Sequence, residues 1–179
     1  MTINKATVTG TVTSSGSALT LNGAKIVSGV TLSNGCKFTM TAGEVYRSNG
    51  TALTNSGTGA IEVLGGVIEG TTYGINNTGT GTITIGSLTN GVISSGDPII
   101  TGGTYGVKTS ANFNFYDGML RGKTGSYQGT VTAVEEGTHI KKDTPEGNGT
   151  DYHRAYIESN DVFVEVWDIS KLKQEYHYF

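Results

Sequence analysis

The side chains that could perform acid–base chemistry are few in this chain. Residues 1–129 contain five carboxylic acids, which are Glu44, Glu62, Glu69, Asp97 and Asp117. Glycoside hydrolysis needs two carboxyl groups on opposite sides of one bond. Elimination on a uronate needs calcium, a cation that binds oxygen ligands such as carboxylates, next to an Arg or Lys base. The small number of acids argues against both reactions, so we expect no catalytic residue and no enzyme.

The positions of these acids point the same way. Glu62 occupies the centre of an apolar–polar–apolar triplet, and the equivalent positions elsewhere hold uncharged residues: Thr20, Thr39, Thr84 and Asn114. No acidic cluster is therefore expected around Glu62. Glu44 and Glu69 are expected on successive repeats near Arg47 and Arg121. A solvated surface pair is the interpretation we favour for them, because exposed ion pairs are common and weak.

The histidines and the single cysteine do not indicate a metal site or a reactive thiol. The three histidines, His139, His153 and His177, are separated by 14 and 24 residues, which is not a metal-binding spacing. Cys36 is the single cysteine and has no partner for an internal disulfide. It directly precedes a predicted strand, so we expect a buried side chain and not a reactive thiol. The sequence predicts no metal and no cofactor.

Tyrosines supply the best candidate for a binding face. Tyr73 and Tyr105, with Tyr127 as a third candidate, recur at the spacing of the repeat. Stacked aromatic rings on one face can bind sugars, but they can equally cover a corner with the ring packed and the hydroxyl in water. The candidate ligand or partner face consists of Tyr73, Tyr105 and Asp97. Threonine also recurs at outward positions, which ordinary β propensity explains better than an ice-binding ladder.

The elements that would position these residues belong to an internal repeat. Each copy contains an apolar–polar–apolar triplet, followed by small residues and a further apolar residue. The triplets are Leu19–Leu21, Phe38–Met40, Ile61–Val63, Ile83–Ile85 and Phe113–Phe115. The further apolar residues are Ile26, Val45, Ile68, Ile93 and Leu120. Repeats of this length, with strand-like triplets and glycine at the corners, are typical of solenoids.

The predicted fold is all-β: a single-stranded, right-handed parallel β-helix of about five rungs with a β-rich C-terminal tail. The triplets and the further apolar residues would form three inward columns. A fourth inward column is predicted at Leu53, Ile75 and Val107. The right-handed sense is expected from the preference of parallel crossovers. The repeats that define the rungs begin near residue 15.

The fourth repeat is longer than the others, since the step from Ile85 to Ile93 is eight positions where the corresponding step in the other copies is five. The additional segments are Ser87–Thr89 and Ser95–Ile100. The interpretation we favour is a loop without function, or an extra strand pair through Pro98–Thr101. The alternative is a pair of loops that form a cleft, because insertions in solenoids often emerge on a binding side.

Composition changes near residue 130. Residues 1–129 contain 25 of the 28 glycines, whereas residues 130–179 contain ten acidic and five basic side chains. We therefore divide the chain into a β-helical repeat region, 1–135, and an acidic, aromatic-rich cap or assembly segment, 136–179. In the second part, strands are expected at 130–134, 155–157 and 162–167, an exposed loop at 141–149, and one helical turn around 170–173.

Four segments resemble a known group of proteins: Ala60–Gly70, Thr72–Asn76, Gly81–Gly86 and Asn112–Lys123. They are similar to the Gly/Thr-rich β-helical repeats of large surface-exposed or secreted, adhesin-like proteins of Gram-positive bacteria, whose outline is that of the pectate-lyase-like solenoids. The resemblance covers roughly residues 15–135. It implies a passive extracellular stalk or adhesin segment, located outside the cell or at its surface.

Charge and hydropathy limit the partners. The formal charge of −3 gives no footprint for nucleic acid, and no segment is apolar enough to span a membrane. The expected function is a non-catalytic extracellular structural or adhesive module, with carbohydrate or a host surface as candidate partner. The alternative is a carbohydrate-active β-helix enzyme or a tailspike-like polysaccharide-binding protein.

Self-association is the last expectation, because an open β-helix end presents unpaired backbone groups. Apolar residues at both ends suggest a head-to-tail filament, in which the tail of one chain covers the first rung of the next. The alternative is a monomer whose tail caps its own solenoid. The candidate assembly contacts are Ile3, Val8, Phe163, Trp167, Tyr176, Tyr178 and Phe179.

Overall fold

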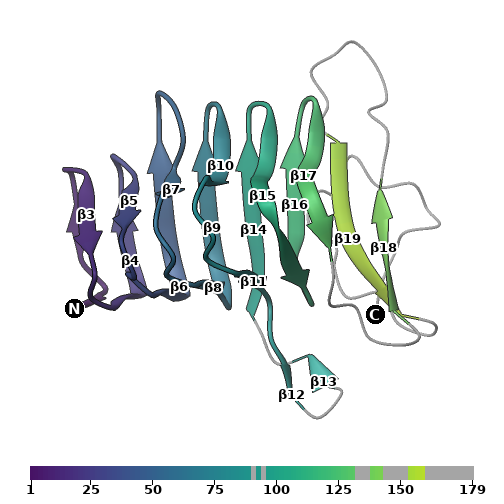
Figure 1. The fold of residues 1–179 in the computed structure, drawn as a ribbon, viewed down its shortest axis with the longest axis horizontal. Coiled ribbons are helices and arrows are strands. Elements are labelled where there is room, and N and C mark those ends of the chain that lie inside the picture. The colour runs from purple at the N-terminus through teal and green to yellow at the C-terminus, as the bar shows by residue number, and fades with distance from the viewer. Residues whose placement is uncertain (90–91, 94–95, 132–137, 143–152, 160–179) are drawn as a thin grey trace.

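The computed structural model describes residues 1–89, 92–93, 96–131, 138–142 and 153–159. The described residues form an all-β, parallel solenoid of about 6 turns and contain no helix. Figure 1 shows the turns stacked side by side from the N-terminal turn to strands β18 and β19. Because these residues contain no helix, no helical segment among them could cross a membrane.

Each complete turn contributes a strand to each of three parallel faces, and three corners separate these faces. Face A consists of β1 (Thr2–Asn4), the first halves of β4 (Leu19–Ile26) and β6 (Phe38–Arg47), β8 (Ile61–Val63), β11 (Ile83–Ile85) and the end of β15 (Tyr105–Phe115). Face B consists of β2 (Thr7–Val8), the second halves of β4 and β6, β9 (Gly65–Gly70), β14 (Gly96–Gly102) and β16 (Met119–Gly122). Face C consists of β3 (Val12–Ser15), β5 (Val30–Ser33), β7 (Leu53–Asn55), β10 (Tyr73–Asn77), the start of β15 and β17 (Gly125–Val131).

The predicted inward columns are confirmed by the strand register. On face A, Leu19 is followed in register by Phe38, Ile61, Ile83 and Phe113, and Leu21 by Met40, Val63, Ile85 and Phe115. On face C, Leu53, Ile75 and Val107 are partners on successive turns. All these side chains are fully buried, so the core is the interior of the coil and the alternation of apolar and polar residues sets the register.

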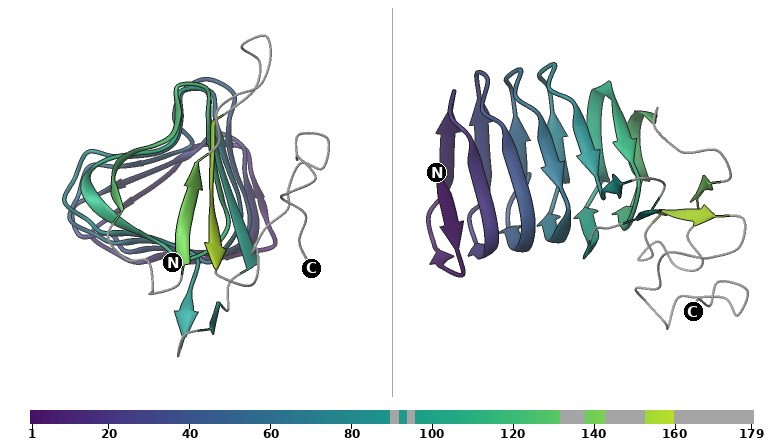
Figure 2. Two further views of the ribbon diagram at one scale, coloured as in Figure 1. Left: turned by 90° about the vertical axis from the view of Figure 1, so that its right-hand side faces the viewer. Right: turned by 90° about the horizontal axis from the view of Figure 1, so that it is seen from below.

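The third column is confirmed except at the fourth repeat, where the prediction of Ile93 was wrong. Ile100 takes this position, paired with Ile68 on one side and Leu120 on the other. Ile93 belongs instead to a short antiparallel pair, β12 (Leu88–Thr89) with β13 (Val92–Ile93), which projects outside the outline of the coil (Figures 1 and 2). The additional residues of this repeat therefore form a hairpin that precedes β14, the face B strand of the fifth turn. Residues 98–101, expected in an extra strand pair, lie within β14 itself.

The count of about five rungs was one too few. The segment before residue 15 makes a turn of its own: Ile3 is in register with Leu21, Val8 with Ile26, and Val12 with Val30. Its strands are short, and its triplet pattern is weaker than in later copies. Ile3 and Val8 extend the inward columns and pack against the core, but both stay half-buried at this end of the stack.

The corner between faces B and C is narrow, as the view along the coil shows (Figure 2). Gly102 ends β14 and Tyr105 begins β15, so the chain reverses within two residues. A methyl group at Gly102 would overlap the carbonyl oxygen of Tyr105. The corners of the preceding and following turns have Gly70 and Gly122 in register with Gly102. Glycine is required here because the two strands approach too closely for any side chain.

The described part of the tail covers its own solenoid. Strand β19 (His153–Ser159) pairs antiparallel with β16 of the last turn, and β18 (Thr138–Lys142) pairs antiparallel with β19. The expected strand at 155–157 is thus confirmed. Of the loop expected at 141–149, Lys141 and Lys142 belong instead to β18, and residues 143–149 lie outside the described residues. The strand predicted at 162–167, the helical turn and the aromatic contacts from Phe163 to Phe179 lie outside the described residues.

Candidate ligand-binding face

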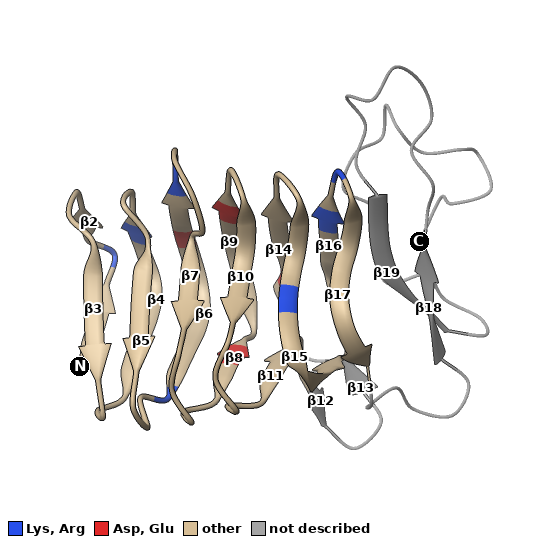
Figure 3. Ribbon diagram, turned by 45° about the horizontal axis from the view of Figure 1, so that its top comes forward, with Lys and Arg blue, Asp and Glu red and all other residues tan. Residues whose placement is uncertain are grey.

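Face C differs from the other faces in its charge. Strands β3, β5, β7, β10 and β17 contain no charged residue, and β15 contains Lys108 alone. Figure 3 shows these strands free of charge apart from one band in β15. The outward positions along this face are in register from turn to turn: Thr13, Thr31, Thr54, Asn76, Lys108 and Gln128. One cation therefore stands in a row of uncharged hydrogen-bonding side chains.

The structure brings Tyr73 and Tyr105 together at the start of this face. They are register partners on β10 and β15, and their rings stack with centroids 6.4 Å apart and planes inclined by 18°. The ammonium group of Lys108 lies 4.9 Å from the centroid of the Tyr73 ring and donates a hydrogen bond to its hydroxyl oxygen at 3.3 Å. Cation–π contact and hydrogen bond together hold the lysine against the tyrosine pair.

Tyr127 is not the third member of this stack. It is in register with the buried Val107, two residues beyond the position that pairs with Tyr105, and it packs edge-on against Phe113 with ring centroids 5.3 Å apart. The position next to Tyr105 on the last turn is Gly125, and a methyl group there would come within 2.9 Å of the Tyr105 ring. The tyrosine rings are thus covered by each other, by Lys108 and by Gly125. Of the two predicted roles, the packed corner fits this geometry better than a platform for a sugar ring.

A groove lined by residues with polar side chains lies near the tyrosine pair, at the corner between faces C and A, where successive turns use fewer and fewer residues. From the outward position of face C to the first inward position of face A, the chain uses 83 − 76 = 7 residue steps in the fourth turn. It uses 113 − 108 = 5 steps in the fifth turn and 131 − 128 = 3 in the sixth. The corner that follows Asn76 in the fourth turn is therefore longer and projects further than the corners of the fifth and sixth turns. This difference in height leaves a depression on the surface.

The groove has a volume of about 350 Å³. Its lining contains three amide side chains, three hydroxyl side chains, one ammonium group and no carboxylate: Asn76, Asn77, Thr78, Lys108, Thr109, Ser110, Gln128 and Gly129. This volume is within the range of about 300–1,000 Å³ that is usual for small-molecule sites. The amide oxygen Oδ1 of Asn76 is buried and accepts no hydrogen bond from the described residues. Such an acceptor is expected to be satisfied by a bound molecule or water.

A ladder of buried polar side chains supports the floor of the groove. Asn55 donates to the Oδ1 of Asn77 at 3.0 Å, and Asn77 donates to the hydroxyl oxygen of Thr109 at 3.4 Å. Each asparagine also donates to a backbone carbonyl oxygen four residues ahead, in Gly59 and Gly81, at 3.1 and 2.7 Å. This ladder was not predicted from the sequence, because asparagine usually indicates an exposed turn. The repeated spacing Asn-x-Gly-Thr-Gly at residues 55–59 and 77–81 could have indicated it.

The carboxylates lie away from the groove and form no cluster of three with other acids, histidine or cysteine in the part of the chain that the structure describes. Glu44 forms an ion pair with Lys25 at 2.7 Å, and not with Arg47. Glu62 forms an ion pair with Lys37 at 3.3 Å and accepts a hydrogen bond from Thr39 at 3.2 Å. Glu69 is separated from Arg121 by the intervening register position, Thr101. Glu44 thus lies in a surface pair, as predicted, although its partner is Lys25 and not Arg47. The pair of Glu62 with Lys37 was not predicted.

Asp97 does not join the tyrosine pair. It is exposed, has a φ of 42°, and lies at an irregularity near the start of β14 on face B. Tyr105 follows the other end of this strand. At about 3.3 Å per residue, the five residue steps from Asp97 to Gly102 span about 16 Å. Asp117 is fully buried. Cys36 is buried as predicted, and its thiol donates to the hydroxyl oxygen of Ser14 at 3.1 Å.

Comparison with protein-family models, with curated proteins and with solved structures finds no match to this chain. The part of the resemblance that concerns architecture agrees with the fold, since the described residues form a parallel β-solenoid. Any function has to be argued from the faces of this solenoid.

Proposed function

We propose that this chain is a non-catalytic β-solenoid module with a structural or adhesive role outside the cell, and that it engages carbohydrate through face C. The observation on which this proposal rests most is the groove beside Tyr73 and Tyr105, which is lined by amide, hydroxyl and ammonium groups and lacks carboxylates. Sugars are recognised by such groups, because each hydroxyl both donates and accepts hydrogen bonds.

The rigidity of the scaffold supports an adhesive role. Strands on face C are hydrogen-bonded to both neighbours from the second turn to the fifth, and the buried asparagine ladder fixes their register. Groups placed on such a surface lose little conformational entropy when a ligand binds, which favours binding by weakly interacting sugars. The separated acids argue against the competing proposal, a carbohydrate-active enzyme, because hydrolysis needs two carboxyl groups at one bond.

The proposal predicts binding without turnover. In affinity electrophoresis through gels containing a panel of neutral and acidic polysaccharides, we expect retardation by at least one polymer. After overnight incubation with the protein, we expect every polymer to keep its chain length and to gain no new reducing ends or unsaturated products. Products that disappear in Asp97→Ala or Asp117→Ala would establish the enzymatic alternative and refute the proposal.

We also propose that the chain forms a head-to-tail filament. In this filament, the open edge of the first solenoid turn pairs with strands at the C-terminal end of a second copy. Among the described residues, β1 and β2 pair with β4 alone, so their outer edges have no strand partner. Ile3 and Val8 continue the core columns but stay half-buried there, and another turn would cover them. Burial of these two side chains favours association by about 25 cal/mol per Å² of apolar surface removed from water.

Light scattering on the intact chain tests this association. We expect assembly that grows with concentration, and a much smaller assembly for the double variant Ile3→Asp, Val8→Asp, which places two carboxylates at the open edge. A chain that ends at Ser159 tests whether the terminal aromatic residues are the connector. A monomeric intact chain at high concentration would rule out the filament and leave the self-capped monomer.

A further inference from the structure

We infer that the groove on face C selects an anionic sugar residue, with Lys108 binding its carboxylate or sulfate and Asn76 accepting a hydrogen bond from one of its hydroxyl groups. This inference deepens the proposed function and rests on it. It specifies the charge class of the carbohydrate and adds Lys108, Asn76 and Gln128 to the candidate site. None of these three residues was among the candidates predicted from the sequence.

Lys108 gives the groove its charge preference. It is the one charged residue of the groove lining and of all face C strands. Its ammonium group has three donors, and the structure uses one of them for the hydroxyl oxygen of Tyr73. The Tyr73 contacts fix the position of the ammonium group, so an anion in the groove meets a cation whose conformational entropy is already reduced. The lining contains no carboxylate, so no negative charge in the groove repels an anionic ligand.

Asn76 accounts for the second feature of the proposed ligand, a hydroxyl group that donates a hydrogen bond. Its Oδ1 is buried and has no donor among the described residues, which is costly for a polar atom out of water. In register, Asn76 and Gln128 lie on either side of Lys108. The unsatisfied acceptor therefore belongs to a residue of the groove lining, next to a cation on the adjacent strand, and a ligand reaches it when the Asn76 side chain turns toward the groove. A ligand that satisfies both has a hydroxyl donor and an anionic group on one small framework, as a uronic acid residue has. A simple anion such as phosphate or acetate satisfies the cation but offers no array of hydroxyl groups.

The size of the groove fits one sugar residue of a chain. A volume of about 350 Å³ corresponds to about a dozen water molecules at about 30 Å³ each. A pyranose ring with its substituents displaces several of these waters and leaves room for others that bridge to Thr78 and Ser110. The groove is open at the surface, so the neighbouring residues of a polysaccharide can continue outside it.

Isothermal titration with a matched pair of ligands tests the inference. The probes are a hyaluronan hexasaccharide, which contains glucuronate, and its carboxyl methyl ester, which has the same hydroxyl groups without charge. We expect the acid to bind at least tenfold more tightly than the ester at low salt, and we expect this difference to shrink at about 0.3 M salt because of screening. Lys108→Met keeps the aliphatic stem, and we expect it to reduce the affinity for the acid to that for the ester.

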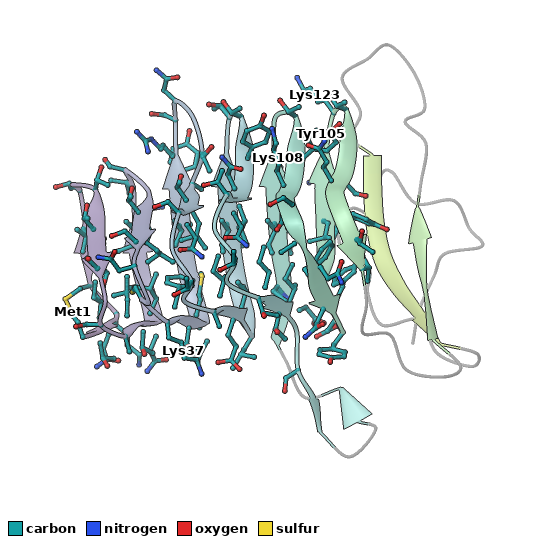
Figure 4. All side chains as sticks on the ribbon, viewed as in Figure 1. Met1, Lys37, Tyr105, Lys108 and Lys123 are labelled. Carbon is teal, nitrogen blue, oxygen red and sulfur yellow. The ribbon has the colours of Figure 1, made fainter. Side chains whose placement is uncertain are left out.

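Matched variants separate a specific site from general attraction. Lys37→Met changes the net charge equally but lies at the opposite edge of the coil from Lys108 (Figure 4), and it should bind as the unsubstituted chain does. Asn76→Ala should weaken acid and ester alike, because both lose the same hydroxyl partner. Equal losses in Lys37→Met and Lys108→Met would overturn the inference, as would equal affinity of the unsubstituted chain for acid and ester.

The outcomes also separate this inference from the proposed function. If neutral polysaccharides bind and Lys108→Met changes nothing, the anionic preference is wrong while the carbohydrate-binding role stands. If no polysaccharide of the panel binds, the proposed function itself fails. Thermal unfolding of each variant, followed by circular dichroism, checks that the variants are folded before their affinities are compared.

Discussion

Gly102→Ala is expected to destabilise the solenoid by at least about 3 kcal/mol, the upper part of the range for overpacking substitutions. The added methyl group would overlap the carbonyl oxygen of Tyr105 and lie 2.8 Å from the backbone nitrogen of Gly74. Both neighbours are backbone atoms that belong to the hydrogen-bonded corner, so neither can rotate away. Relief requires the corner of the fifth turn to open, and this would also separate Tyr73 from Tyr105.

Urea unfolding followed by far-ultraviolet circular dichroism measures this effect, with Gly10→Ala as the matched control. A methyl group at Gly10 would meet nothing within 4 Å, and its φ does not lie in the left-handed region. The control is expected to unfold within about 1 kcal/mol of the unsubstituted chain, because it changes mainly the entropy of the unfolded state. Equal stability of the two variants would contradict the narrow corner between faces B and C.

Asn77→Ala is expected to cost about 3 kcal/mol. The side chain is 1% exposed, donates to the carbonyl oxygen of Gly81 at 2.7 Å and accepts from Asn55 at 3.0 Å. Alanine would leave a buried carbonyl oxygen without its donor and a small cavity between two turns. An unsatisfied buried polar group costs about 1–3 kcal/mol, and the lost packing adds to this.

The same urea experiment measures the second effect, and Asn49→Ala is its control. Asn49 is exposed at the tip of the corner between β6 and β7, where a truncated side chain should change stability by less than about 0.5 kcal/mol. The substitution at Asn77 should in addition reduce affinity for the hexasaccharide, since the ladder supports the floor of the groove. If Asn77→Ala proved as stable as Asn49→Ala, the buried ladder would not contribute to the fold as argued.

The core of this fold could be predicted from the sequence because its signal is local and repeated. A strand with one buried face alternates apolar and polar residues. Because each turn stacks in register on a similar turn, the apolar residues recur at the same positions of every turn. The columns at Leu21, Ile26 and Leu53 follow directly from these two rules. The glycines at the corners were also predictable in kind, although not the close approach that makes Gly102 necessary.

The candidate site was less accessible to sequence reasoning. The columns predicted Tyr73 and Tyr105 as neighbours, but the groove depends on the difference in length between successive corners, which only the register reveals. The assignments of Ile93 and Tyr127 failed for a related reason. The number of residues in a turn varies, and a spacing rule cannot follow this variation. The hairpin delays the core position from Ile93 to Ile100, whereas the shorter step that follows brings Gly125 and not Tyr127 next to Tyr105. The buried role of Asn77 was missed because asparagine usually indicates an exposed turn.

The most direct measurement maps where a bound glycan lies while its integrity is monitored. Amide and side-chain NH₂ signals in two-dimensional NMR spectra are followed as hyaluronan hexasaccharide is added, and the sugar is analysed afterwards by chromatography. The account predicts that the largest shifts occur at Asn76, Lys108 and Gln128, and that the hexasaccharide is recovered intact. Shifts concentrated around Asp97 and Asp117, together with a shortened sugar, would contradict it.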